Sequence, residues 1–218
     1  IVHARRRDDD CWTDAVLSAI GPDTAIVAVP NCHWADGGLV DLVRVADAAR
    51  EVGAALVIDA TQSLGALPLD LERVQPDYLV TACYKWMMGP YGTALLYVAP
   101  ARHEGEPIEQ GWFNRAGSGD FARLVDYRDD YEPGARRFDM GEMSNPPLMM
   151  GALAACELLL GWGVGNIADT LGSATAALAN RARSLGLTVL DEEKRAPHFL
   201  ALGFPGGIPD GLADRFAA

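Results

Sequence analysis

The sequence lacks several features that mark particular classes of protein. It has no run of about 18 apolar residues, so we expect no membrane-spanning helix. The opening residues IVHARRRDDD lack the charged-then-apolar order of a signal peptide. Its 18 Lys and Arg are outnumbered by 30 Asp and Glu, and the net charge of -12 argues against nucleic acid or anionic membrane as a partner. We therefore expect a cytoplasmic protein that binds neither.

The sequence also lacks the cysteine and histidine spacings of disulfide frameworks and zinc sites. Its four cysteines are far apart and form no CxxC pair, and its four histidines are equally scattered. The cysteines Cys11, Cys32, Cys83 and Cys156 lie mostly in apolar surroundings. This pattern favours reduced thiols in a protein core, without a metal site.

Half of the 218 residues are apolar, which is enough for a proper core in one or two domains. The first half alternates short apolar runs with one amphipathic helix, a pattern typical of a parallel sheet covered on both faces. The predicted strands span 24–30, 54–59, 76–84 and 93–99, and the predicted helix spans 39–53. The fourth strand follows a tight GPYG turn, so we predict that it is antiparallel or at the edge.

The second half changes character at about residue 102. Residues 102–147 are rich in Gly, Asp, Arg and Tyr, and irregular segments of this length are usually functional loops or interface arms. Apolar periodicity returns further on and predicts helices over 148–163 and 167–186, strands over 187–190 and 198–204, and the start of a helix in GLADRFAA. We therefore predict a large domain over 1–163 and part of a smaller α+β domain over 164–218.

Two charged residues follow predicted strands. Asp59 ends the run ALVID, and Lys85 follows the run PDYLVTACY. Ligands of open parallel sheets bind beyond the carboxyl ends of the strands, which is where both side chains are expected. Taken alone, Asp59 could simply cap the next turn and Lys85 could extend its stem to solvent.

Taken together, the two residues match the needs of pyridoxal phosphate. This cofactor requires an amine for a Schiff base and a carboxylate that keeps its pyridine nitrogen protonated. Gln62 could reach the phenolic oxygen of the ring, or it could be a polar turn residue. The hydroxyl of Tyr84 could donate to the phosphate, or the side chain could be ordinary strand packing.

The stretch VIDATQSLGALPLDLERVQPDYLVTACYKWMMGPYG resembles the cofactor-binding core of the class V aminotransferases. These are fold-type-I pyridoxal phosphate enzymes that include cysteine desulfurases and kynureninases. The resemblance implies a three-layer α/β sandwich with a mainly parallel sheet. It also implies that Asp59 binds the pyridine nitrogen, that Gln62 occupies the place of a ring-oxygen partner, and that Lys85 carries the aldimine.

Two further stretches, GWF at 111–113 and SNPPL at 144–148, resemble kynureninase segments. By that resemblance Trp112 and Asn145 bind the cofactor, partly across the interface of a homodimer, although Trp112 could instead anchor its loop. In HWADG, His33 and Trp34 are expected near the site, and a packed His-Trp corner is the alternative. The sequence departs from kynureninases at DATQS, because Gln62 stands where they have histidine.

The resemblance predicts an enzyme acting on an amino acid, by transamination, β-lyase chemistry or desulfuration. Desulfuration needs a nucleophilic cysteine on a mobile loop; none of the four cysteines is placed for it, but that loop could fall beyond Ala218. The resemblance begins inside the family's large domain, so we expect the family's phosphate-binding turn and carboxylate-binding arginine outside these 218 residues. The alternative is a non-catalytic chain that keeps the fold and acts as an interaction protein.

Overall fold

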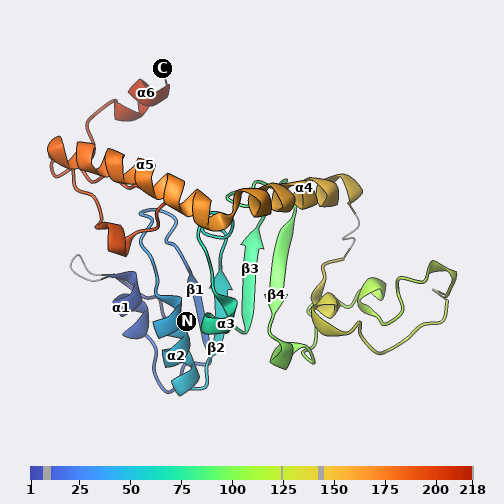
Figure 1. Cartoon of the computed structure of the whole chain (residues 1–218). Coiled ribbons are helices and arrows are strands. Elements are labelled where there is room, and N and C mark those ends of the chain that lie inside the picture. Colours follow the sequence, from blue (N-terminus) through green and yellow to red (C-terminus); the bar gives the residue numbers. More distant parts are fainter. Residues whose placement is uncertain (7–10, 124, 142–144, 218) are drawn as a thin grey trace.

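A four-stranded sheet forms the centre of the protein. The computed structural model describes residues 1–6, 11–123, 125–141 and 145–217 (Figure 1). The strands lie in the order β1 (Ile26–Pro30), β2 (Ala55–Asp59), β3 (Tyr78–Ala82) and β4 (Ala94–Val98). The first three strands are parallel, and β4 pairs antiparallel with β3. The α/β fold with a mainly parallel sheet is therefore confirmed, as is the antiparallel edge strand.

Three helices cover one face of this sheet: α1 (Trp12–Leu17), α2 (Leu42–Glu51) and α3 (Leu71–Val74). Because strand side chains alternate between faces, Leu56 and Ile58 point toward α2, where they meet the fully buried Val45. Each such buried aliphatic side chain contributes about 1.5–3 kcal/mol of hydrophobic stabilisation. The helix predicted over 39–53 is α2, whereas α1 and α3 were too short for the periodicity to predict.

The other face of the sheet carries exposed apolar side chains within the described residues. Ile26 on β1 is 63% exposed, Val80 on β3 is 38% exposed and Leu96 on β4 is 42% exposed. On β1 and β3 they alternate with buried residues, as the two-residue period of a strand requires, whereas on β4 the adjacent Leu95 and Leu96 are both exposed.

Helices α4 (Pro146–Trp162) and α5 (Val164–Ser184) run across the end of the sheet to which the arrow of β3 points (Figure 1). They confirm the helices predicted over 148–163 and 167–186. The two are bent by 73° at Gly163, whose φ of +79° suits glycine. No single described helix is long and apolar enough to cross a membrane, although this bent pair meets the criterion jointly by length and composition. The proposed domain boundary coincides with the bend and stays a prediction.

Residues 103–123 and 125–141 belong to an arm that extends beyond β4 (Figure 1). As predicted, the arm is irregular, and its helical segments are the short 3-10 turns η2 (Trp112–Asn114), η3 (Phe121–Arg123) and η4 (Gly134–Phe138). The arm has its own polar core, because the buried Asn114 Nδ2 donates to the carbonyls of Arg137 (2.7 Å) and Asp139 (2.9 Å). A further 3-10 turn, η1 (Pro100–Arg102), leads into it.

The strands predicted over 187–190 and 198–204 are wrong. Thr188 and Gly203 exchange two backbone hydrogen bonds, but no neighbouring pair extends this single bridge into a ladder. The chain turns between them, and the Phe199 N–H donates to the Ala196 carbonyl. An apolar run cannot form a strand without a partner along its length. The helix expected in the tail is present as α6 (Leu212–Ala217), after a 3-10 turn, η5 (Glu192–Lys194).

Candidate functional site

Asp59 lies at the carboxyl end of β2, paired with Pro30 of β1 on one side and Val80 of β3 on the other. Its Oδ1 accepts a hydrogen bond from the Thr61 N–H (2.9 Å), which is the turn cap that a lone aspartate predicts. The side chain is exposed, and Oδ2 has no partner among the described residues. The carboxylate is therefore held in place by one oxygen and can accept a ligand with the other.

Two hydrogen bonds tie the turn after Asp59 to the end of β3. The Ala60 N–H donates to the Val80 carbonyl (2.8 Å), and Thr61 Oγ1 accepts from the Ala82 N–H (3.1 Å). Lys85 lies three residues beyond Ala82. The position of the carboxylate and the start of the lysine loop are consequently fixed by the same contacts.

Lys85 lies in a tight loop. The Gly89 N–H donates to the Cys83 carbonyl (2.8 Å), and the Met88 N–H donates to the Lys85 carbonyl (2.9 Å). Met88 has a φ of +56°, a conformation that L-residues rarely adopt and that surrounding contacts must hold. The Lys85 side chain is half-buried, and its Nζ makes no hydrogen bond or ion pair within the described part of the chain.

Tyr84 and Tyr91 stack on one another with ring centroids 4.4 Å apart and planes 13° apart. The Lys85 Nζ lies 5.7 Å from the centroid of the Tyr84 ring, within reach of a cation–π interaction. Tyr91, which belongs to the GPYG turn, thus supplies the ring that packs against Tyr84. The Tyr84 side chain is 39% exposed, so its hydroxyl is accessible to a ligand.

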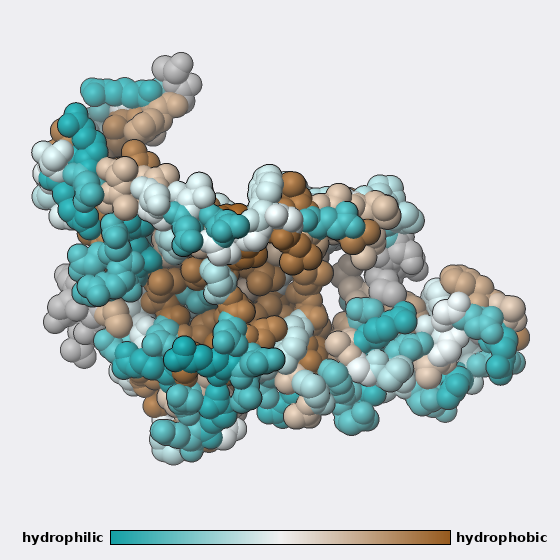
Figure 2. Space-filling model, in the orientation of Figure 1, coloured by the Kyte–Doolittle hydropathy of each residue, from teal (hydrophilic) through white to brown (hydrophobic). Residues whose placement is uncertain are grey.

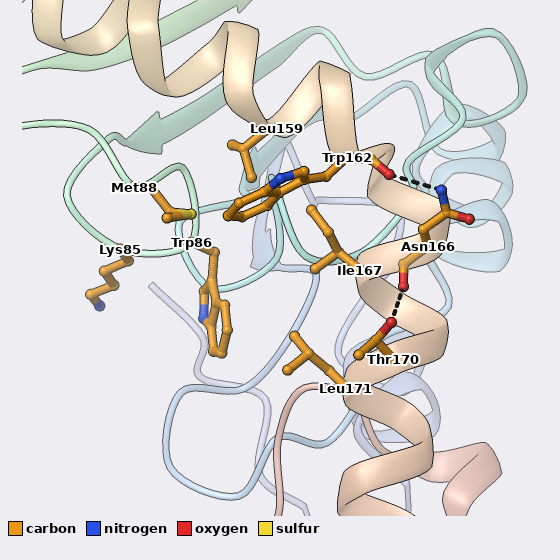
Figure 3. Close-up of a pocket in the computed structure, with 10 residues that line it drawn as sticks. Lys85, Trp86, Met88, Leu159, Trp162, Asn166, Ile167, Thr170 and Leu171 are labelled. Atoms are coloured by element: carbon orange, nitrogen blue, oxygen red, sulfur yellow. Dashed lines mark hydrogen bonds between the residues drawn. The ribbon is translucent and has the colours of Figure 1, made fainter.

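An apolar cavity of about 570 Å³ adjoins the lysine loop. Figure 3 shows Trp86, Trp162 and Ile167 facing one another, whereas the amine of Lys85 points away from them. In the space-filling view, hydrophobic surface gathers below α4 and α5 (Figure 2). The cavity is lined by Gly65, Lys85, Trp86, Met88, Leu159, Trp162, Asn166, Ile167, Thr170 and Leu171.

His33 follows β1, but its ring is engaged by neighbours other than Asp59 and Lys85. It stacks on Trp12 (centroids 4.2 Å apart), and its Nδ1 lies 2.9 Å from Asp36 Oδ1. Burial alone would raise the pKa of the Asp36 carboxyl, but hydrogen bonds from the Gly38 N–H, Trp12 and His33 lower it. His33 is thus packed against a tryptophan, but the partner is Trp12 and not the expected Trp34, which is 72% exposed.

Trp112 and Asn145 are not brought together with Lys85. Trp112 lies in the arm, where its ring packs edge-on against Phe113 and Phe121, each with centroids 6.0 Å away. Asn145 is the N-cap of α4, and its Oδ1 accepts from the Leu148 N–H (3.3 Å). Within one chain, the contacts of these two residues lie in the arm and in α4.

Two neighbours of the site, Gly65 and His198, were missed by the sequence analysis. Gly65 has a φ of +95°, and a Cβ there would lie 2.4 Å from the Trp86 carbonyl oxygen. Its place after DATQSL could have suggested a turn glycine, but not this contact. His198 donates from Nε2 to the Gln62 carbonyl at 2.6 Å across 136 residues of sequence, a separation that no local pattern predicts. The Gln62 side chain is half-buried.

The site therefore combines a free amine, an anchored carboxylate, an amide and a phenol at the carboxyl ends of β2 and β3. Such a set can attach an aldehyde covalently through the amine and hold a protonated ring nitrogen through the carboxylate. Within the described residues no group of three or more His, Cys, Asp or Glu could hold a metal ion.

Comparisons with known proteins agree with this chemistry. The chain is 31% identical over 169 residues to the uncharacterized aminotransferase YcbU of Bacillus subtilis, covering 77% of this chain and 43% of the relative. It is 28% identical over 143 residues to kynureninase of Burkholderia mallei, covering 64% of this chain and 32% of that relative. The chain thus spans less than half the length of these relatives.

The same fold occurs in the apo structure of a cysteine desulfurase from Thermococcus onnurineus. The TM-score is 0.74 at 21% identity, over 94% of this chain and 50% of that one. The model of the family described as "Aminotransferase class-V" matches residues 3–214. The match runs through the carboxylate, the lysine loop, the arm and both long helices, and the chain therefore belongs to the class V aminotransferase family.

Proposed function

We propose that this chain forms part of a pyridoxal-phosphate-dependent enzyme that acts on an amino acid. One observation carries the proposal: Asp59 and Lys85 leave adjoining parallel strands, and hydrogen bonds from Ala60 to Val80 and from Ala82 to Thr61 link their turns. Family membership supports the same cofactor.

The residues present fit this cofactor. Asp59 Oδ1 is used by the Thr61 N–H, which leaves Oδ2 for the hydrogen of a protonated ring nitrogen. The amine of Lys85 is not paired with a carboxylate among the described residues, so no ion pair has to break before it reacts. Gln62 lies in the turn directly after Asp59, where its amide can reach a ring oxygen.

When bound, pyridoxal phosphate supplies a ring that withdraws electrons from the substrate carbon. The Asp59 carboxylate would hold a proton on the ring nitrogen, and this charge would make the ring a better electron acceptor. The Lys85 amine would hold the cofactor covalently and would serve as the base for the proton at the substrate α-carbon. The Gln62 amide and the Tyr84 hydroxyl would be donors for the ring oxygen and the phosphate.

Transamination and β-lyase chemistry fit the described residues better than desulfuration. A desulfurase needs an accessible thiolate, whereas Cys32 and Cys83 are buried. Burial, reinforced by the Asp36 carboxylate, raises the pKa of Cys32 to about 12 and keeps it a thiol. Cys11 and Cys156 are only partly exposed; Cys11 is the N-cap of α1, and Cys156 lies within α4.

We also propose a cytoplasmic homodimer. Trp112 lies on an arm that extends away from its own sheet, and its indole N–H could reach the cofactor of a second chain. Asn145 caps a helix that begins beside this arm. This arrangement would complete two sites at one interface.

Titration with pyridoxal phosphate tests the proposal. The expected result is a saturable absorbance change in the wild-type chain that disappears in Lys85→Ala and persists in the control Lys194→Ala. Product analysis with kynurenine, cysteine sulfinate and an alanine–pyruvate pair then separates the reactions. If the wild-type chain gives no absorbance change, the proposal fails, and the alternative of a non-catalytic interaction protein is favoured.

A further inference from the structure

A short segment near the C-terminus touches all three strand-end loops of the candidate site. We call residues 194–199 the bridging segment. Its backbone pairs with the loop after β1, since the Leu39 N–H donates to the Lys194 carbonyl (2.9 Å) and the Ala196 N–H donates to the Gly37 carbonyl (2.8 Å). Gly37 also lies against the side chain of Phe199, where a Cβ on residue 37 would be only 2.2 Å from the Phe199 Cβ.

His198 connects the bridging segment to the other two loops, which are the turn after Asp59 and the lysine loop. Its Nε2 lies 2.6 Å from the Gln62 carbonyl oxygen, and its ring meets the Trp86 ring edge-on with centroids 4.5 Å apart. Gln62 belongs to the turn after Asp59, and Trp86 directly follows Lys85. One buried side chain, 7% exposed, thus contacts both segments that carry the candidate cofactor residues.

The protonation of His198 follows from these contacts. A carbonyl oxygen can only accept, so Nε2 carries the hydrogen of the neutral ring. Nδ1 is buried and has no partner among the described residues, so a second proton would be left without a hydrogen bond. His198 in its neutral form is consequently a donor to the Gln62 carbonyl, with its ring packed against Trp86.

The bridging segment is itself anchored to α5. Arg195 Nη1 donates to Thr175 Oγ1 (3.0 Å) and to the Phe199 carbonyl (2.9 Å), and Thr175 Oγ1 donates to the Pro197 carbonyl (2.8 Å). Arg195 is 3% exposed, so these bonds lie out of water and hold the segment firmly. The position of His198 is therefore set by α5 together with the loop after β1.

We infer that His198 is a positioning residue that holds the Gln62 turn and the lysine loop at a fixed separation for cofactor binding. The inference rests on the proposed function, because the quantity that His198 sets is the spacing between Asp59 and Lys85. Without its N–H the Gln62 carbonyl would lose its donor, and the turn that carries the carboxylate could move relative to the amine.

The test compares wild type with His198→Leu, His198→Gln and His103→Leu. Leucine removes the donor but fills the space, and glutamine restores an N–H near the position of Nε2. His103 is a matched control, because its Nε2 also lies near a backbone carbonyl, that of Val98 at 3.0 Å, outside the candidate site.

Amide hydrogen exchange without cofactor is the first measurement. His198→Leu is expected to exchange about tenfold faster over 60–65 and 84–88, the equivalent of about 1.4 kcal/mol, with His198→Gln and His103→Leu near wild type in both segments. Unchanged exchange in His198→Leu, or an equal loss in His103→Leu, overturns the inference. This measurement needs no cofactor, so it decides the role of His198 even if the proposed function fails.

Pyridoxal phosphate affinity, followed by absorbance, is the second measurement. His198→Leu is expected to raise the dissociation constant about tenfold, and His198→Gln is expected to restore it to within about twofold of wild type. If His198→Leu binds as tightly as wild type, His198 does not position the site. If the wild type itself gives no absorbance change, the proposed function fails, and the exchange data alone judge His198.

Discussion

The end of the sheet and the arm both carry residues that the sequence assigns to one cofactor, but these residues are held in place by different contacts. At the end of the sheet, Asp59 and the start of the lysine loop share backbone hydrogen bonds between β2 and β3. In the arm, Trp112 packs against Phe113 and Phe121, near the hydrogen bonds that Asn114 donates to the carbonyls of Arg137 and Asp139. The sheet end thus joins its two residues within one chain, whereas the part of Trp112 depends on the second chain that we propose.

The two regions also differ in how they are held. The turn after Asp59 is fixed by the sheet below and by His198 above, so its geometry follows from the core. The arm is held by contacts of its own, including the Ala116 N–H on the Asp130 carbonyl (2.9 Å) and the stack of Arg115 on Tyr131 at 4.2 Å. Its placement relative to Lys85 is therefore less constrained by the sheet, which suits an interface element.

At the end of the sheet, Asp59→Asn is expected to have the largest effect, a loss of affinity for pyridoxal phosphate. Asparagine keeps an oxygen for the Thr61 N–H, so the turn survives, but the negative charge facing the ring nitrogen is lost. A hydrogen bond to a charged group contributes about 1.5–3 kcal/mol, so pyridoxal phosphate affinity should fall by roughly tenfold to a hundredfold. The measurement is absorbance titration. Asp70→Asn, at the N-cap of α3, is the control, and an equal loss there would remove Asp59 from its role.

A comparison of Gly65→Ala with Gly53→Ala tests whether the turn after Asp59 lies in close contact with the lysine loop. Both glycines have positive φ, so each alanine costs about 1–2 kcal/mol of backbone strain. A Cβ at 53 meets nothing within 4 Å, whereas one at 65 meets the Trp86 carbonyl, which should add about 1–3 kcal/mol. Urea unfolding measures the difference in free energy of unfolding. Equal losses would show that the two loops are not in close contact.

Trp112→Ala tests whether the arm serves a second chain. Loss of the indole N–H should weaken pyridoxal phosphate binding about tenfold. Mixing Trp112→Ala with Lys85→Ala should restore part of the absorbance, because one site of a mixed dimer would have an intact lysine and an intact tryptophan. Two variants that bind no better together than apart would place Trp112 outside the neighbouring site.

The smallest expected effect is a dependence of stability on pH from His198. Burial lowers the pKa of His198, and the hydrogen bond to the Gln62 carbonyl opposes part of that shift. The unfolded chain therefore takes up a proton more readily than the folded chain, so stability falls as the pH drops below about 6.5. His198→Gln should flatten this slope in urea unfolding between pH 7 and 5, and an unaltered slope would assign it to other groups.

The sequence predicts the end of the sheet well because local rules apply there. Apolar runs define β1 to β3, and parallel strands bring their carboxyl ends to one edge, so Asp59 and Lys85 had to lie near each other. The same rules predict α4 and α5 but fail for the strands expected at 187–190 and 198–204. The run at 198–204 has the composition of a strand, but its residues instead pack around Trp86 and pair only at Gly203. Contacts between residues 136 positions apart, such as Gln62 with His198, leave no local pattern.

Reduction with borohydride in the presence of pyridoxal phosphate, followed by peptide mapping, tests the central claim most directly. The chain has two lysines, Lys85 in the candidate site and Lys194, which lies 3.7 Å from Asp191 and has a half-exposed side chain. The account predicts a reduced pyridoxyl adduct on Lys85 at one equivalent of cofactor, with Lys194 unmodified. An adduct absent from Lys85, or shared equally with Lys194, would contradict it.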